Sequence, residues 1–195
     1  MLSARAWLAA LVGIAACVCV ARAQDGSGPF PGVIQSKIGS QSVTLDLTGA
    51  AVRKKGIFSV YWVGSYLEQG AKVGSAEDLA AADKAKQLHL IMLRRVSGPE
   101  MAAAFVSLLR QNHPAPKFAE ESAKLAQLLQ NSTAQRGDQI WLTHIPKVGL
   151  FCRRAGQEGF LIANVEFSKA VWENYLGRYN VGESVKRGLV ERLTN

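Results

Sequence analysis

Alternating hydrophobic and polar positions predict a series of short strands along the chain. A long apolar run extends from Ile57 to Leu67, with Gly64 as its only breaker. It is rich in β-branched and aromatic residues on both faces, which is typical of a strand that is covered on both sides. We therefore expect this strand to lie at the centre of the fold. The other predicted strands cover residues 33–38, 42–47, 87–96, 139–145, 149–154 and 159–167.

Helical periodicity separates these groups of strands. Ser75 and Asp78 form a helix start similar to a capping box, and Pro99 stands near the first turn of a second helix. Because strands cluster early and late, with helices between and after them, the pattern predicts an α+β fold with an antiparallel sheet and helices on one face. The predicted helices cover residues 76–84, 98 to about 112, 118 to before 137, 168–176 and 183–193.

The N-terminus has the parts of a secretory signal peptide. Arg5 supplies positive charge, residues 6–20 form an unbroken apolar run, and Ala21-Arg22-Ala23 is an A-x-A cleavage site. The apolar run is too short for a convincing membrane span. The alternative is a lipoprotein signal ending at Cys17, although the apolar run continues past this cysteine. We expect residues 1–23 to be a cleaved signal peptide.

Cleavage after Ala23 would leave a periplasmic or secreted protein. Residues 24–32 are rich in glycine and proline and are interpreted as a flexible leader, and residues 33–195 as one domain. Once the signal is removed, Cys152 is the only thiol, so no internal disulfide or cysteine-based metal cluster can form. No stable membrane insertion is expected after cleavage, and the oligomeric state stays open.

The chain is basic, with 23 lysines and arginines, 15 acidic residues and a formal net charge of +8. Such a balance suits nucleic acid or a membrane surface, but the basic residues are scattered along the sequence. An exported protein also has little access to nucleic acid. We therefore interpret the charge as favouring solubility and attracting small anionic ligands, and we expect no nucleic-acid partner.

Arg53 is the candidate binding residue because it stands at the mouth of the central strand, where it could face an apolar pocket. Its guanidinium could grip a carboxylate or phenolate through two parallel hydrogen bonds. Spacing alone favours the alternative, an ordinary strand-end charge beside Lys54 and Lys55. Tyr61 could supply a second hydrogen bond. A simple hairpin would place the two backbones about 16 Å apart at about 3.3 Å per residue, but both side chains are long, so their convergence stays open.

The other reactive residue types indicate no cofactor and no metal. His89, His113 and His144 lack the spacing of metal ligands and are interpreted as structural residues. Cys152 has no histidine or aspartate pattern that would make it a nucleophile, and we interpret it as a small buried residue. The sequence contains no phosphate loop and no hydrolase or zinc-protease motif.

Three blocks of sequence carry a resemblance to a known family. They are Leu47–Leu67, which includes Leu47-Thr48-Gly49, Val52-Arg53, Val60-Tyr61 and Gly64-Ser65-Tyr66-Leu67; Leu93–Pro99; and Phe167–Glu173, followed by Leu176-Gly177 and Val181–Leu193. In this order the blocks resemble the chalcone isomerase family, and more closely its bacterial, secreted, chalcone isomerase-like branch. The resemblance spans nearly the whole chain after the predicted signal peptide.

The resemblance implies an open-faced β-sandwich, in which a large antiparallel sheet and a layer of helices enclose a ligand cleft. Arg53 matches the arginine that binds the anionic end of the ligand in this family. Tyr61 falls where fatty-acid-binding relatives carry tyrosine and plant isomerases usually carry threonine. Ser168 falls at a Ser/Thr position that lines the isomerase pocket.

Two positions depart from the isomerases, which hold water and substrate with a tyrosine and an asparagine on a central helix. Phe118 and Leu125 stand at these positions, and neither side chain can hydrogen-bond. We therefore expect a non-catalytic module that binds a fatty acid or similar amphipathic anion. The alternatives are an intramolecular lyase acting on an unknown enone, and a vestigial cleft with a structural or interaction role.

Overall fold

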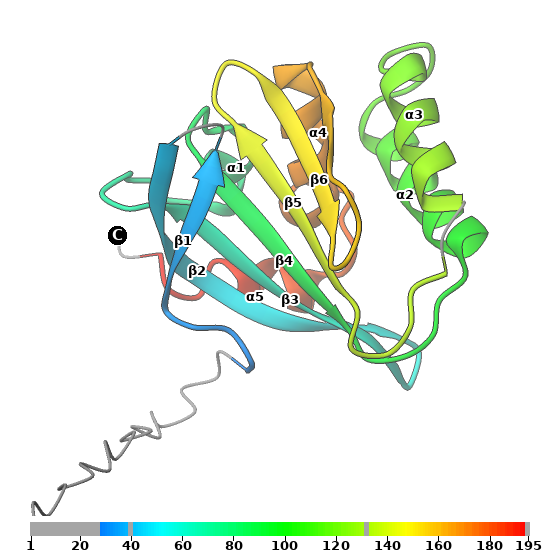
Figure 1. Cartoon of the computed structure of the whole chain (residues 1–195), viewed down its shortest axis with the longest axis horizontal. Coiled ribbons are helices and arrows are strands. Elements are labelled where there is room, and N and C mark those ends of the chain that lie inside the picture. Colours follow the sequence, from blue (N-terminus) through cyan, green and yellow to red (C-terminus); the bar gives the residue numbers. More distant parts are fainter. Residues whose placement is uncertain (1–27, 39–40, 131–132, 194–195) are drawn as a thin grey trace, which may run out of the picture.

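The computed structural model describes residues 28–38, 41–130 and 133–193. Within these ranges, one antiparallel sheet contains seven strands whose spatial order follows their order in the chain (Figure 1). The strands are β1 (Val33–Ile38), β2 (Gln41–Lys55), β3 (Phe58–Glu68), β4 (Lys86–Met92), β5 (Gln139–Ile145), β6 (Gly149–Arg154) and β7 (Phe160–Ile162). The predicted signal peptide, its cleavage site and Cys17 lie outside the described residues.

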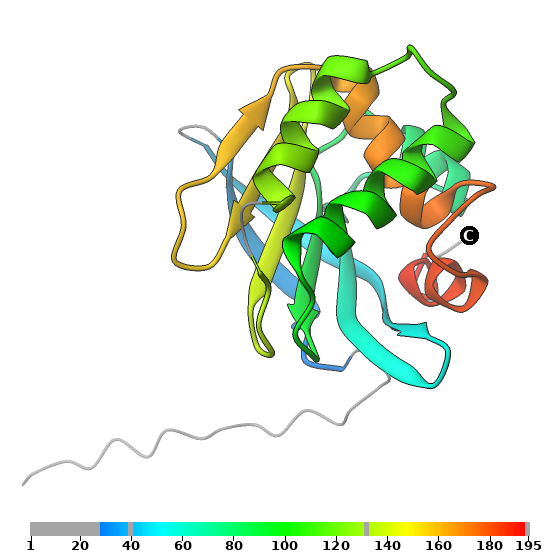
Figure 2. The ribbon, with the colours of Figure 1, turned by 90° about the vertical axis from the view of Figure 1, so that its right-hand side faces the viewer.

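The helices of the described ranges lie between β3 and β4, between β4 and β5, and after β7. They cover one face of the curled sheet, which Figure 2 shows from the side. The helices are α1 (Ala76–Ala81), α2 (Gly98–Asn112), α3 (Ala119–Gln130), α4 (Val165–Leu176) and α5 (Glu183–Leu189). The predicted α+β fold, an antiparallel sheet with a layer of helices, is confirmed. None of these helices combines the length and the apolar character needed to cross a bilayer.

The main core lies between the sheet and helix α4. Phe167 and Trp172 of α4 are fully buried in the same apolar cluster as Val63 and Leu67 of β3. Burial of large apolar side chains on this scale is the main favourable contribution to folding. The inner face of β3 therefore faces the main core, in agreement with its apolar sequence.

The outer face of β3 is covered by the segment that precedes β1. Phe30 is buried there, and its ring lies so close to Gly64 that a Cβ atom at this glycine would come within 2.8 Å of it. The Tyr66 hydroxyl donates to the backbone oxygen of Pro31 at 3.1 Å. This accounts for the two apolar faces of the central strand. Phe30, within the segment 24–32 that was predicted to be a flexible leader, thus packs on the sheet, while residues 24–27 of that segment lie outside the described residues.

Several predicted boundaries are wrong by a few residues or more. The strand predicted over 42–47 continues to Lys55 as the long strand β2, and the strand predicted to end at 96 ends at Met92. The strand predicted over 159–167 ends at Ile162, because Asn164 caps helix α4: its Oδ1 accepts the Phe167 N–H at 2.9 Å. The first and last helices end at Ala81 and Leu189.

Candidate functional site

A cavity of about 520 Å³ lies between the sheet and helices α2, α3 and α4. Strands β2 to β5 supply one wall and the three helices supply the other. Its volume falls in the range of small-molecule pockets, and its lining is predominantly apolar, as in such pockets. The apolar lining residues are Val60, Leu90, Met92, Val96, Met101, Ala103, Ala104, Phe105, Leu108, Leu125, Leu129, Ile140, Leu142 and Val181.

Arg53 and Tyr61 meet in this cavity because β2 folds back on β3 around Gly56. The two residues are paired directly across the hairpin, so their side chains lie on the same face of the sheet. The separation of about 16 Å predicted from the sequence is wrong, because a tight turn replaces the distance along the chain by the spacing between neighbouring strands, about 4.8 Å. The register shifts immediately after Arg53, at an irregularity of the ladder.

The guanidinium of Arg53 keeps donors for a ligand. Its Nη1 donates to the backbone oxygen of Lys54, and Nη1 also lies near Gly182. Among the described residues, no carboxylate forms an ion pair with Arg53. A half-buried guanidinium with no acidic partner and an apolar cavity beside it is complementary to an anionic head group.

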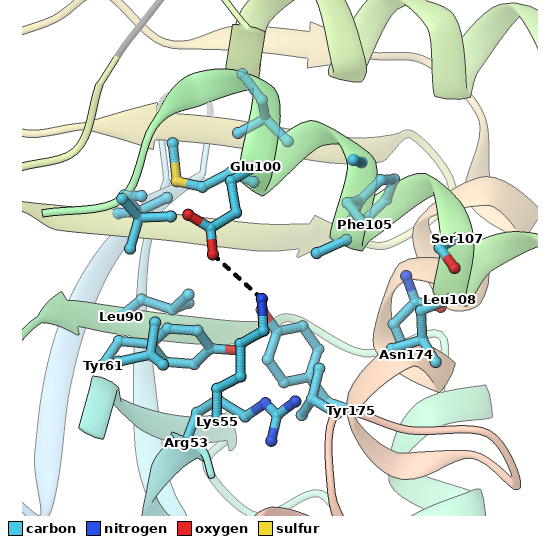
Figure 3. A pocket seen from close by; sticks show the side chains of 18 of the residues that line it. Arg53, Lys55, Tyr61, Leu90, Glu100, Phe105, Ser107, Leu108, Asn174 and Tyr175 are labelled. Carbon is cyan, nitrogen blue, oxygen red and sulfur yellow. Dashed lines mark hydrogen bonds and ion pairs between the residues drawn. The ribbon is translucent and has the colours of Figure 1, made fainter. Parts of the chain in front are cut away.

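Two tyrosines lie next to Arg53 in the cavity wall (Figure 3). Burial raises the pKa of Tyr61 above its ordinary value, while the neighbouring Tyr175 side chain and the positive charge of Arg53 act in the opposite direction. Burial also raises the pKa of Tyr175 well above its ordinary value. Both phenols are therefore neutral near pH 7, and because the two side chains hydrogen-bond each other, one O–H group is left to donate to an anion.

An ion pair spans the cavity between the β2–β3 hairpin and the first turn of α2. Lys55 Nζ lies 3.4 Å from the Glu100 carboxylate, as the dashed line in Figure 3 shows. The side chains are 71% and 43% exposed, and ion pairs this exposed contribute about 1 kcal/mol or less. This contact can therefore break at little cost, and it marks the solvent-facing mouth of the cavity.

Asn174 lines the cavity and adds a polar group that was not predicted from the sequence. Its orientation is set by Asn112 of α2. Asn112 is oriented by Tyr179: its Nδ2 donates to the Tyr179 backbone oxygen at 2.7 Å, and its Oδ1 accepts the Tyr179 N–H at 3.4 Å. Its Nδ2 also donates to Asn174 Oδ1 at 3.4 Å. This turns the Asn174 amide nitrogen the other way, and that buried nitrogen has no hydrogen-bond partner among the described residues.

A buried donor without a partner destabilises a fold by about 1–3 kcal/mol. Asn174 also lines the cavity, so an acceptor atom of a ligand could satisfy it. No local sequence signal singles out this asparagine. Its role depends on the bonds that Asn112 of α2 makes to α4 and to the segment after it, which are more than sixty residues away in the chain.

Ser168 does not line the cavity. It is fully buried on α4, where its Oγ lies 2.8 Å from His144 Nδ1. His144 Nε2 in turn lies 3.0 Å from the Asp83 carboxylate. Because a carboxylate only accepts hydrogen bonds, Nε2 carries the ring hydrogen and Ser168 donates to Nδ1. Ser168, His144 and Asp83 are hydrogen-bonded in the same sequence as the residues of a hydrolase triad. Ser168 and His144 are both fully buried, however, so no substrate can reach them, and the cluster instead connects α4 to the sheet.

The two positions that depart from the isomerases have different surroundings. Leu125 is buried and lines the cavity. Phe118 immediately precedes α3 and packs away from the cavity lining, with its ring centre 5.3 Å from that of His113 and 5.7 Å from that of Phe167. Neither residue brings a hydrogen-bonding side chain to the cavity.

The histidines and the cysteine are occupied by the fold. His89 stacks on Trp141 and bonds Gln139 at 2.9 Å, and His113 bonds Glu173 at 2.6 Å. Cys152 is buried, which raises the pKa of its thiol. Within the described ranges, no three His, Cys, Asp or Glu side chains form a group that could hold a metal ion.

Comparisons with known proteins agree with this architecture. Residues 32–191 match the family model described as chalcone isomerase-like. A comparison with curated proteins gives no match. Among solved structures, a fatty-acid binding protein of Arabidopsis thaliana has a similar fold, with a TM-score of 0.59 and 15% sequence identity over 83% of this chain and 91% of that chain. At this level of identity, the likeness concerns the fold alone.

Proposed function

The chain belongs to the chalcone isomerase-like family, and on this premise we propose that it is a binding protein for a fatty acid or similar amphipathic anion. The observation that carries the proposal is the apolar cavity of about 520 Å³ with Arg53 in its wall. The alkyl chain would lie among the apolar side chains of α2, α3 and β5. The carboxylate would meet the guanidinium and the neutral tyrosines.

The chemistry of the lining supports binding over catalysis. Leu125 is apolar, and the two phenols beside Arg53 stay protonated near pH 7, so neither supplies a ready general base. An open cavity also disagrees with a vestigial cleft filled by its own side chains. The fold shared with a fatty-acid binding protein supports the ligand class.

Export forms part of the same proposal and is supported by the N-terminal sequence pattern. The intact mass of the mature protein tests it. We expect a chain that begins at Gln24, and a lipid-modified chain that begins at Cys17 would contradict soluble export.

Calorimetric titration of dodecanoate tests the role of Arg53. Hydrogen bonds to charged groups contribute about 1.5–3 kcal/mol, so Arg53→Ala is expected to weaken binding about tenfold to a hundredfold. Arg53→Lys should recover part of this loss, because an ammonium keeps the charge but lacks the planar fork. Tyr61→Phe should weaken binding less, by about 0.5–1.5 kcal/mol.

Lys54→Ala is the matched control, since Lys54 is exposed at the adjacent position and does not line the cavity. Its affinity for dodecanoate should stay within twofold of the parent. Equal losses in Lys54→Ala and Arg53→Ala would show that diffuse surface charge, and not a pocket arginine, attracts the ligand.

A further inference from the structure

The turn between β2 and β3 exposes two adjacent large apolar side chains. Ile57 is 88% exposed and Phe58 is 60% exposed, the highest values among the exposed large apolar residues described. Phe58 pairs with Lys55 across the hairpin. Single exposed apolar residues are ordinary, but a protruding apolar pair beside lysines needs an explanation.

Basic residues from three separate segments lie at the same end of the sheet as this apolar pair (Figure 1). The hairpin, the β4–α2 connection and the α3–β5 connection lie at the same end of the sheet (Figure 1). We call this end the basic tip; it comprises Lys54, Lys55, Ile57, Phe58, Arg94, Arg95 and Arg136.

Backbone and side-chain contacts hold the three segments together. The Arg94 guanidinium lies over the Phe58 ring, 5.8 Å from its centre, and the N–H after Met92 donates to the Val60 oxygen at 2.9 Å. The Gly137 N–H donates to the Met92 oxygen at 2.8 Å, which places Arg136 beside the end of β4.

The charge of the basic tip is not neutralised locally. Of the acidic residues near it, Glu100 pairs with Lys55, and Asp138 pairs with Arg154, which lies outside the tip. No ion pair of Lys54, Arg94, Arg95 or Arg136 occurs among the described residues. The tip therefore presents net positive charge around an apolar centre.

We propose that the basic tip docks on the surface of a bilayer that contains anionic lipids. Ile57 and Phe58 would enter the interfacial region, and the basic side chains would bind lipid phosphates, a combination that favours reversible peripheral binding. The tip borders the cavity mouth, since Lys55 and Arg94 belong to both. Docking thus turns the mouth towards the bilayer, and the loading of a fatty acid from it rests on the proposed function.

Sedimentation with vesicles tests the docking. We expect the protein to bind vesicles of phosphatidylcholine with one quarter phosphatidylglycerol, to bind pure phosphatidylcholine at least tenfold more weakly, and to dissociate as salt is raised, because salt screens exposed charges. Binding to neither kind of vesicle, or equal binding to both, would overturn the proposal.

Two double variants assign the binding to the tip. Ile57→Ser with Phe58→Ser, and Arg95→Gln with Arg136→Gln, should each weaken binding to the anionic vesicles at least fivefold. The matched controls are Val148→Ser with Leu161→Ser, which are exposed apolar residues elsewhere, and Lys37→Gln with Lys72→Gln, which are exposed lysines elsewhere. If the control variants lose as much binding as the tip variants, the tip is not the docking surface.

Dodecanoate binding without vesicles separates this inference from the proposed function. None of the four residues changed in the tip variants lines the cavity, so these variants should bind dodecanoate as the parent does. Vesicle binding by a protein that does not bind dodecanoate would support docking and contradict the proposed function. Dodecanoate binding by a protein that does not bind anionic vesicles would support the proposed function and contradict docking.

Discussion

At the scale of single residues, Arg53 and Ser168 were both expected to line a ligand pocket, but their surroundings differ. The resemblance assigned both to a ligand pocket. Arg53 lines the cavity, whereas Ser168 is buried on α4 and bonds His144. A hydroxyl at a ligand position and a hydroxyl at a structural position look alike in a sequence, because the difference lies in which neighbour it faces.

Replacing Ser168 tests this assignment. Ser168→Ala should lower the free energy of unfolding by about 1–3 kcal/mol, because it leaves the buried His144 Nδ1 without its donor. Its affinity for dodecanoate should stay within twofold of the parent. Urea denaturation and calorimetric titration measure the two effects. A tenfold loss of affinity with unchanged stability would show that Ser168 contributes to ligand binding.

The lowered pKa of His144 predicts how the free energy of unfolding depends on pH. Burial, with the nearby charge of Lys86 acting in the same direction, lowers the pKa of His144 from 6.5 to about 4. Between these values the unfolded chain binds more protons than the folded protein, so the free energy of unfolding should rise as pH increases from about 4 to 6.5. Asp83 opposes the shift, and Lys169 adds to it.

His144→Gln should reduce this rise, as measured by urea denaturation at a series of pH values. Some slope will remain, because burial also lowers the pKa of His89. An unchanged slope in the variant would show that His144 does not titrate as its burial requires.

At the scale of elements, two glycines allow α5 to dock on β2. A Cβ atom at Gly49 would lie 2.0 Å from the Gly188 backbone oxygen, and one at Gly188 would lie 2.7 Å from the Ala50 oxygen. Beside them, the Thr48 hydroxyl donates to the Leu189 oxygen at 2.8 Å. Close backbone approach here anchors the C-terminal helix to the strand that carries Arg53.

Gly49→Ala is therefore expected to destabilise the protein by about 1–3 kcal/mol or more, because the new methyl group meets backbone atoms that cannot move aside cheaply. Gly32→Ala is the control, since no atom lies within 4 Å of the position of its Cβ. Thermal unfolding of both variants measures the difference. Similar unfolding temperatures for both variants would contradict the close contact.

At the scale of the whole molecule, the fold holds a cavity whose polar groups suit binding. Leu125 lines it where the isomerases are expected to carry asparagine, and Phe118 packs on Phe167 outside it. We therefore expect no conversion of chalcone to flavanone above the spontaneous rate. A spectrophotometric assay of chalcone cyclisation measures this, and turnover that disappears in Arg53→Ala would favour the lyase alternative.

The tertiary structure also changes the interpretation of the net charge. In the sequence, basic residues are scattered and suggest only solubility and attraction of small anions. In the fold, the ends of β2 and β4 and the start of β5 come together, so Lys54, Arg94, Arg95 and Arg136 share one end of the molecule. Charge that is dispersed along the chain becomes local through the meander topology.

The sequence by itself determined the elements, the fold class and one candidate binding residue. Apolar periodicity, helix starts such as Ser75 and Ser97, and turn residues act over a few positions and are readable locally. The family blocks added Arg53. Boundaries such as the start of α4 were misplaced because the capping bond of Asn164 competes with strand-like side chains that follow it.

Only the tertiary structure decided which side chains meet. The pairing of Arg53 with Tyr61 depends on hairpin register, the unsatisfied amide of Asn174 depends on Asn112 in another helix, and the burial of Ser168 depends on His144 in β5. Register and helix packing result from contacts between segments far apart in the chain. A local pattern therefore predicts that an element exists, whereas the site requires the distances between elements that folding establishes.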